Sequence, residues 1–207
     1  VALDCLATLK EFAENAPANG SAQSSSQNLI QSLVRDSEGF PINFAQHIRP
    51  VNQIKHILEP SSVAIIGVSE KTINNGRIIL RNLLENNFDK SRIYIIKPGA
   101  QWIDGCQCVP DVQSLPEKID LFVVVIPALG IPSTLADIAR YDKAWSVLLI
   151  PGGLEEKQGS ESIVADMNRA LAEARTEGKG PLINGGNCLG IRSVPGKYNT
   201  LFIPEYK

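Results

Sequence analysis

From residue 52 onward the chain alternates between short aliphatic runs and longer amphipathic stretches. The aliphatic runs are almost continuous, which is typical of parallel strands that are buried on both faces of a sheet. They predict strands at 62–67, 93–96, 121–126, 147–150 and 182–183, with a further short strand near 107–109. The stretches between them predict helices over about 76–87, from Pro132 onward, and over about 160–177. This order indicates an α/β fold, a doubly wound Rossmann-like parallel sheet with helices on both faces.

The first 50 residues have a different character. Residues 2–15 are typical of a short amphipathic helix, and the Ser-, Gln- and Gly-rich tract over 17–27 has little to bury, as in a flexible linker. We therefore expect an N-terminal helix and linker over 1–50, a Rossmann-like domain over 51–190, and the start of a following domain or a C-terminal extension over 191–207.

Charge and composition narrow the range of partners. A formal net charge of −2 over 207 residues gives no support for a nucleic acid or a membrane surface held by bulk electrostatics. No apolar run reaches the ~18 residues of a membrane span, and the chain shows no signal peptide. The cysteines fit no zinc-ligand spacing, so we expect no metal site and a reduced, cytoplasmic protein. We interpret Cys106 and Cys108 as two small side chains on one face of a short strand.

The most informative stretch begins with the strand at 62–67. The strand ends at Gly67, a polar loop follows, and a helix begins near Gly76. Backbone amides at such a turn, together with the positive end of the helix dipole, suit a phosphorylated ligand. Since the carboxyl ends of parallel strands meet at one edge, we expect the ligand to lie over the segments that follow the strands. These segments are 67–69, 97–98, 127–128, 151–153 and 184–187.

Two departures argue against a nicotinamide dinucleotide. The interval between Gly67 and Gly76 is longer than the Gly-x-Gly-x-x-Gly fingerprint allows. The second strand runs into Lys97, where an acidic residue would hold a ribose hydroxyl, and a lysine there favours a phosphate. The chain also lacks a P-loop lysine, so we do not expect the domain to hydrolyse ATP by itself.

Residues 60–69 resemble the opening of the CoA-binding domain of NDP-forming acyl-CoA synthetases, relatives of the succinyl-CoA synthetase alpha subunit. The same domain occurs in protein lysine acetyltransferases that carry a synthetase-like region. The segment at 186–191 is similar to the Gly-Pro-Asn-Cys-Leu-Gly signature of the family. Weaker similarity lies between these two segments, at 76–84, Pro98, Gly105, 116–121 and 127–128. The resemblance extends over about residues 54–204.

The resemblance implies a ligand, coenzyme A, and roles for particular residues. It places Gly67, Ser69 and Gly76 around the CoA pyrophosphate, Lys97 and Pro98 near the adenosine end, Pro127 and Ala128 beside the adenine, and Asn187 and Cys188 near the pantetheine thiol.

Three further residues are interpreted from their own chemistry, without the family. Arg77 begins a helix, where a cation is unfavourable unless an anion is bound, so we also expect it to contact the ligand. We interpret Trp102 and Trp145 as packing residues.

Three features depart from the family pattern. Lys97 stands where the family usually has Asn, and we expect it to contact the 3′-phosphate. Gly186 replaces a common proline before Asn187. The phosphohistidine of these synthetases belongs to a domain that follows the CoA-binding one, and neither His47 nor His56 matches its motif.

We therefore expect the CoA-binding domain of an NDP-forming acyl-CoA synthetase, which converts an acid, CoA and a nucleoside triphosphate to acyl-CoA, nucleoside diphosphate and phosphate. The chain would hold CoA or acyl-CoA, while CoA-ligase and ATP-grasp domains or subunits of the same enzyme supply the phosphohistidine and the nucleotide site. We expect no catalytic residue in this chain and no turnover by it alone. Two alternatives stay open, a CoA- or acyl-CoA-sensing module of a protein acetyltransferase and an NAD(P)-binding oxidoreductase domain.

Overall fold

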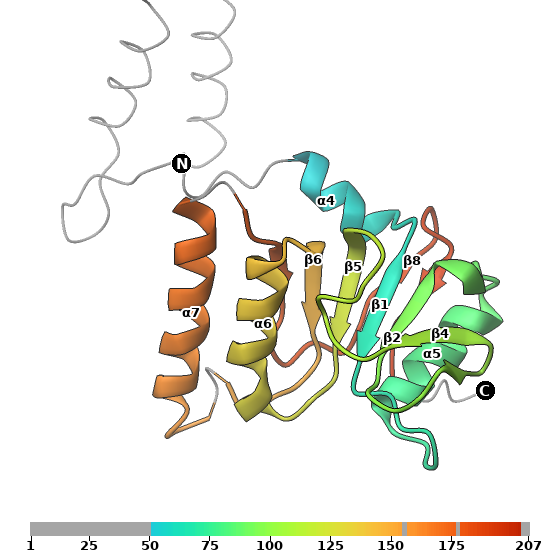
Figure 1. The fold of residues 1–207 in the computed structure, drawn as a ribbon, viewed down its shortest axis with the longest axis horizontal. Coiled ribbons are helices and arrows are strands. Elements are labelled where there is room, and N and C mark those ends of the chain that lie inside the picture. Colours follow the sequence, from blue (N-terminus) through green and yellow to red (C-terminus); the bar gives the residue numbers. More distant parts are fainter. Residues whose placement is uncertain (1–50, 155–156, 177–178, 204–207) are drawn as a thin grey trace, which may run out of the picture. The chain divides into compact units, whose positions relative to one another are not determined.

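A seven-stranded sheet, with strand order β3-β4-β2-β1-β5-β6-β7, forms the centre of the computed structural model (Figure 1). The structure describes residues 51–154, 157–176 and 179–203, so the expectations for residues 1–50 lie outside the described residues. Every pairing in this sheet is parallel except that of β3 with β4. The strands are β1 (Val63–Ile66), β2 (Ile93–Ile96), β3 (Trp102–Ile103), β4 (Cys106–Val109), β5 (Ile119–Val124), β6 (Ala144–Leu149) and β7 (Leu182–Asn184).

The parallel strands follow the Rossmann order. Counted along the chain without β3, they lie in the order 3-2-1-4-5-6, and the direction of winding reverses between β1 and β5. The predicted α/β fold and its parallel sheet are thus confirmed. The antiparallel strand β3 was not predicted, because two residues are too short a run to show a periodicity.

Helices cover both faces of the sheet. Among the described residues, the α-helices are α4 (Val51–Leu58), α5 (Asn75–Glu85), α6 (Ile131–Arg140) and α7 (Glu161–Thr176), and the short 3-10 helices are η1 (Lys90–Arg92) and η2 (Ala128–Gly130). The helices predicted over 76–87 and 160–177 match α5 and α7 to within two residues at each end.

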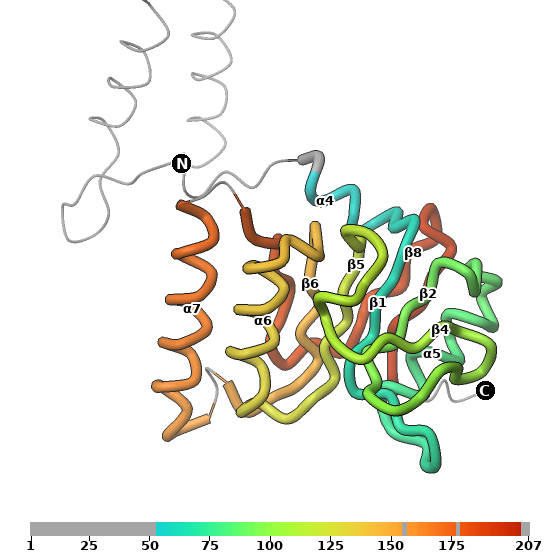
Figure 2. Tube along the Cα trace, in the orientation of Figure 1, coloured from blue at the N-terminus to red at the C-terminus, as the bar shows by residue number. Residues whose placement is uncertain are grey.

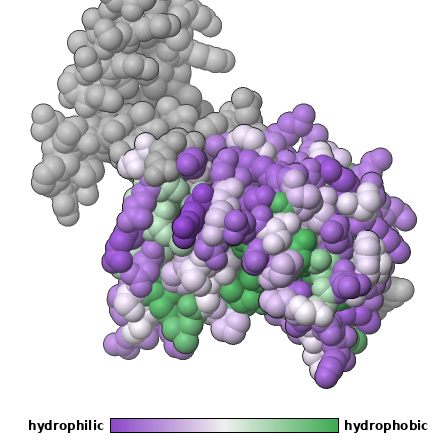
Figure 3. All heavy atoms as spheres, viewed as in Figure 1, coloured by the Kyte–Doolittle hydropathy of each residue, from purple (hydrophilic) through white to green (hydrophobic). Residues whose placement is uncertain are grey.

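Alternate residues of each strand enter two separate hydrophobic clusters. One cluster joins Ala64, Phe122 and Val147 to the apolar sides of α6 and α7. The other joins their strand neighbours, such as Ile65 and Val123, to the apolar side of α5. Burial on both faces explains why the strand sequences are continuously aliphatic instead of alternating with polar residues. The face of the molecule seen in Figure 3 is mainly hydrophilic, with a few apolar patches.

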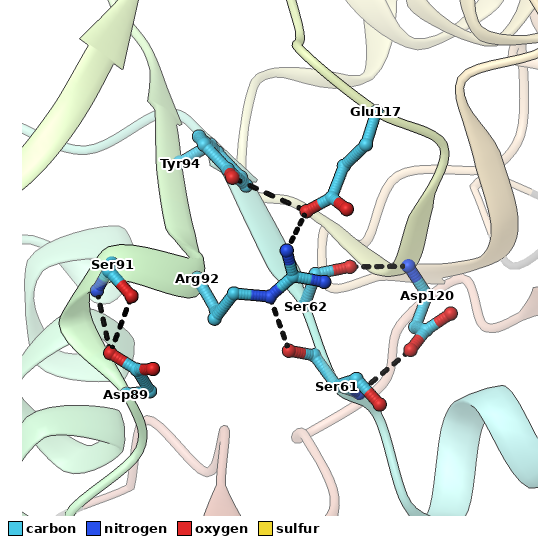
Figure 4. A network of polar contacts seen from close by, with 8 residues as sticks. All are labelled: Ser61, Ser62, Asp89, Ser91, Arg92, Tyr94, Glu117 and Asp120. Carbon is cyan, nitrogen blue, oxygen red and sulfur yellow. Dashed lines mark hydrogen bonds and ion pairs between the residues drawn. The ribbon is translucent and has the colours of Figure 1, made fainter.

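A polar network joins the amino ends of the central strands (Figure 4). Arg92, before β2, forms an ion pair with Glu117 at 2.9 Å and donates from Nε to the Ser61 carbonyl. Asp120 in β5 accepts from the Ser61 amide at 2.7 Å, and its own amide donates to Ser62 Oγ at 3.1 Å. These contacts fix the ends of three adjacent strands at the edge opposite their carboxyl ends.

Helix α4 is attached to this same edge through His56. The His56 Nδ1 atom lies 2.7 Å from the second carboxylate oxygen of Asp120, and its ring stacks on Trp145 with centroids 5.0 Å apart. Lys118 lies over the same indole, 3.6 Å from the ring centroid, and forms an ion pair with Asp142 at 2.7 Å. Trp145 is 37% exposed, and its indole packs against the His56 ring and the Lys118 ammonium group.

The segment after β7 returns to α4 and α5. It forms a hairpin of β8 (Arg192–Ser193) and β9 (Tyr198–Asn199), which Figure 2 shows in red near the end of the described chain. Ser193 Oγ and Tyr198 OH donate to the carbonyls of Leu58 and Ile57, which end α4 without intrahelical partners. The described part of 191–203 thus packs on the sheet domain, in the same compact unit.

No helix within the described ranges is long and apolar enough to cross a lipid bilayer.

We expect Tyr198→Phe to lower the free energy of unfolding by about 1–2 kcal/mol, because the buried Ile57 carbonyl loses its donor. Tyr198 is only 1% exposed, so water cannot replace the hydroxyl. Urea unfolding followed by circular dichroism measures the change. Tyr141→Phe is the matched control, since the half-buried Tyr141 side chain forms no hydrogen bond among the described residues, and it should change stability by less than about 0.5 kcal/mol. Equal losses in the two variants would show that Tyr198 does not hold α4.

Candidate functional site

The loops that follow the parallel strands lie together at the carboxyl edge of the sheet (Figure 1). The parallel register places the ends of β1, β2 and β5 side by side, with Ile66 paired to both Ile96 and Val124. The ends of β6 and β7 continue the same edge. The predicted site residues all lie in these loops or in the first turn of α5, on the side where ligands bind in open α/β sheets.

Gly67 allows the chain to turn where β1 meets β5. Its φ is +106°, and a Cβ atom there would lie 2.1 Å from the Val125 carbonyl oxygen. Gly76 allows the second close approach, because a Cβ atom on it would lie 2.7 Å from the Gly67 carbonyl oxygen. Together the two glycines bring the first turn of α5 against the end of β1, the packing that opens a nucleotide-binding crossover in Rossmann folds.

Asn74 organises the loop between β1 and α5, and the sequence analysis did not identify it. It is the N-cap of α5, and its Oδ1 accepts from the Arg77 amide at 3.0 Å and from the Ser69 amide at 3.3 Å. Its Nδ2 donates to the Gly67 carbonyl at 2.8 Å. The sequence does carry a signal for this role, because Asn is a preferred N-cap residue and Asn74 stands directly before the residues with helical spacing. The cap uses the Arg77 amide, so the earlier amides of the first turn, those of Asn75 and Gly76, remain at the positive end of the helix dipole.

Ser69 shapes the loop. Its amide is used by Asn74, its carbonyl accepts from Arg77 Nη1 at 3.0 Å, and its hydroxyl lies 2.9 Å from Thr72 Oγ1. The loop is thus held by its own polar groups.

Arg77 links the loop to a second segment of the chain. In addition to its bond to Ser69, Nη2 lies 2.7 Å from Oδ1 of Asp104, in the turn between β3 and β4. The Nε atom is buried and has no partner among the described residues. Sequence reasoning expected Arg77 to contact a ligand but missed Asp104. The two residues are 27 positions apart in the chain, and the folding of the sheet brings them together.

An open pocket of about 380 Å³ lies between the β1–α5 loop and the β3–β4 hairpin. Its charged lining residues are Glu70, Arg77 and Asp104. Trp102 also lines the pocket and is 65% exposed, so the interpretation of this residue as a packing residue is wrong. The indole points away from the core because it belongs to a two-residue edge strand, whose other residue, Ile103, is the one that is buried.

Lys97 and Pro98 follow β2 directly. The Lys97 amide donates to the Val109 carbonyl at 2.8 Å, and its carbonyl accepts from Ala100, which closes a tight turn. The Lys97 side chain is half-buried and Pro98 is exposed. This turn borders the pocket through Ala100.

The remaining predicted residues lie toward the other half of the edge. Pro127 precedes η2, and Ala128 packs against the cluster under α6 and α7. Asn187 has a φ of +54° and donates from its amide to the Pro151 carbonyl at 2.9 Å. Cys188 packs against the other cluster, under α5. Ala128 and Cys188 therefore contact opposite faces of the sheet.

The cysteines on β4 are buried and unreactive. Cys106 and Cys108 face the core while Gln107 between them is exposed, which confirms the interpretation of this pair. Burial raises the pKa of the Cys106 thiol to about 11 and raises that of Cys108 as well. Thiols with raised pKa values in apolar surroundings are poor nucleophiles.

The order of the parallel strands and the glycine-dependent crossover define a Rossmann-like domain. The family model described as "CoA binding domain" matches residues 61–193, and the chain belongs to this family. Coenzyme A is accordingly the ligand of this domain.

Two of the proteins to which the chain is similar are ADP-forming acetate–CoA ligases. The chain is 32% identical over 149 residues to the ADP-forming acetate–CoA ligase I of Archaeoglobus fulgidus, covering 72% of this chain and 21% of that protein. It is 31% identical over 156 residues to the alpha subunit of the ADP-forming acetate–CoA ligase I of Pyrococcus furiosus, covering 73% of this chain and 32% of that subunit. The chain thus spans only about a fifth to a third of the length of these relatives.

A solved structure has the same fold. The dinucleotide-forming acetyl-coenzyme A synthetase 1 of Candidatus Korarchaeum cryptofilum, in complex with phosphate and ADP, superposes with a TM-score of 0.65 at 27% identity. The match covers 74% of this chain and 32% of that chain. This chain is therefore homologous to one region of multidomain or multisubunit CoA ligases.

We expect Gly67→Ala to lower the free energy of unfolding by about 3 kcal/mol or more, because the new Cβ collides with the backbone at Val125 and a positive φ is strained for alanine. Gly99→Ala is the matched control. Gly99 has a φ of +85°, but a Cβ atom on it would meet no other atom within 4 Å, so only about 1 kcal/mol of backbone strain is expected. Urea unfolding measures both variants. Equal losses would mean that the approach of β1 to β5 does not require a glycine.

Proposed function

We propose that this chain holds coenzyme A within an NDP-forming acyl-CoA synthetase. The intact enzyme would convert an acid, CoA and a nucleoside triphosphate to acyl-CoA, nucleoside diphosphate and phosphate. The observation that carries the proposal is the match of residues 61–193 to the CoA-binding family, together with relatives that are ADP-forming ligases. Those relatives are several times longer than the matched region, which supports further CoA-ligase and ATP-grasp domains or subunits as its partners.

The diphosphate of CoA would bind at the β1–α5 crossover. The first-turn amides of α5 supply donors and the helix dipole supplies partial positive charge, which suits two linked phosphates. Gly67 and Gly76 contribute by letting the first turn of α5 pack against the end of β1, because a Cβ atom on either would collide with protein backbone. Ser69 would act by holding the loop in shape, because its amide, carbonyl and hydroxyl are already used within it.

The rest of CoA would extend along the edge in both directions. In this proposal Lys97 binds the 3′-phosphate and Pro98 borders the adenosine end. The remaining contacts are assigned to Pro127 and Ala128 at the adenine, and to Asn187 and Cys188 near the pantetheine thiol. None of these residues is assigned a covalent step, and the acyl transfer itself is assigned to the partner domains.

Neither alternative function is favoured by an observation on this chain. The relatives reported above are CoA ligases, which gives no support to a sensing module of an acetyltransferase. Strand β2 runs into Lys97, so the position that would hold a ribose hydroxyl of a nicotinamide dinucleotide carries the wrong charge.

We expect calorimetric titration of the chain to show saturable binding of CoA and no comparable binding of NADH. The CoA diphosphate and 3′-phosphate both match donors at the edge, whereas the dinucleotide lacks its acidic ribose contact. Tight NADH binding without CoA binding would contradict the proposal.

We expect Lys97→Ala to weaken binding of CoA about fivefold while leaving binding of 3′-dephospho-CoA nearly unchanged, since only CoA carries the phosphate that pairs with the ammonium group. The measurement is the ratio of the two dissociation constants in each variant. Lys55→Ala removes an exposed lysine from α4, at the other edge of the sheet, and should leave both constants as they are. Equal weakening of both ligands by Lys97→Ala would reject the 3′-phosphate contact.

A further inference from the structure

The ion pair between Arg77 and Asp104 joins the two segments that border the pocket. Arg77 belongs to the first turn of α5, and Asp104 to the turn between β3 and β4. The side chains are only 15% and 31% exposed, and their closest atoms lie 2.7 Å apart. A charge-assisted bond of this length in a partly buried place is stronger than an ordinary surface ion pair.

Asp104 is placed by the geometry of its hairpin. Both turn residues, Asp104 at φ +50° and Gly105 at φ +81°, have positive φ, and Ile103 and Cys106 pair on either side of them. This is the geometry of a two-residue type I′ turn, which accepts Asp, Asn or Gly at its first position. The carboxylate is therefore not needed for the turn itself, because an asparagine would serve there equally well.

The ion pair reduces the positive charge that is available to a phosphate in this pocket. The lining contains two carboxylates, Glu70 and Asp104, and one cation, Arg77. The guanidinium donates to Asp104 through Nη2 and to the Ser69 carbonyl through Nη1. One donor on each Nη atom is thus used by a protein group, although Arg77 lies at the start of the helix whose N-terminus is assigned to the CoA diphosphate.

We propose that Asp104 is a positioning residue that holds Arg77 away from the phosphates of the ligand and so weakens the binding of coenzyme A. This inference rests on the proposed function. Without the carboxylate, Nη2 of the guanidinium is free to donate to a phosphate, and the positive charge of Arg77 is no longer neutralised by its partner. Removal of one negative charge from the pocket also reduces repulsion of a polyanionic ligand. The ion pair between Arg77 and Asp104 would then both hold the loop in place and weaken the binding of CoA.

The test is a calorimetric titration of the full chain with CoA, at low and at high salt. Asp104→Asn should bind CoA about fivefold more tightly than the unchanged chain at low salt, and the gain should shrink at high salt because it is electrostatic. Asp104→Gly, which also fits the turn, should show a gain of the same sign. Asp142→Asn is the matched control, since it breaks the ion pair to Lys118 at the opposite edge, also 2.7 Å long, and should leave the affinity for CoA unchanged.

A double-mutant cycle separates the proposed role from a general loosening of the loop. The gain from Asp104→Asn should be much smaller in an Arg77→Ala background, because no guanidinium is left to release and only the reduced repulsion remains. A loosened loop would instead bind CoA more weakly in every background. Repetition with 3′-dephospho-CoA and with inorganic pyrophosphate shows whether the released arginine meets the diphosphate or the 3′-phosphate.

The outcomes distinguish this inference from the function on which it rests. If the unchanged chain binds CoA and Asp104→Asn binds it equally or more weakly, the role of Asp104 is overturned and the proposed function stands. If the gain persists undiminished without Arg77, the arginine is not the group that Asp104 restrains. If the unchanged chain does not bind CoA at all, both proposals fall.

Discussion

The close approach of the Gly67 backbone to the Val125 carbonyl is the constraint on which the rest of the structure depends. It occurs where β1 and β5 lie side by side and the winding of the sheet reverses, so the chain must leave the two strands in opposite directions from one point. A side chain at Gly67 would hold the strand ends apart, and one at Gly76 would hold α5 away from them. Without both contacts the first turn of α5 would not lie against the end of β1.

The polar side chains at the two edges of the sheet have different structural roles. At the amino edge Arg92 pairs with Glu117, and Arg92 and Asp120 both bind the backbone of Ser61, so that three strand ends are fixed (Figure 4). At the carboxyl edge the loop side chains form caps and turns, and Asn74 alone holds three backbone groups. The first arrangement contributes rigidity. The second arrangement gives the loop between β1 and α5 a defined shape.

Much of the fold and part of the site could be predicted from the sequence, and the misses share one cause. Continuous aliphatic runs and apolar residues at helical spacing predict strands and helices locally, and Gly67 was found because it ends such a run. Asp104, Trp102 and the attachment of Tyr198 to α4 were missed. Each of them depends on which segments the sheet places next to one another, and a short edge strand or a two-residue hairpin strand leaves no periodic pattern to detect. Trp102 was interpreted as a packing residue, and its exposure follows from its position on the edge strand β3.

The sequence by itself determined the alternation of strands and helices, the glycines of the crossover and the family to which they point, because these depend on local spacing and on short motifs. Only the tertiary structure decided that Arg77 is engaged by Asp104, that the last described segment closes the end of α4, and that Ala128 and Cys188 contact opposite faces of the sheet. Those facts depend on strand order and on the direction in which each side chain leaves its strand. Neither is encoded in the residues of any one segment, since both arise when distant parts of the chain bury their apolar faces against each other.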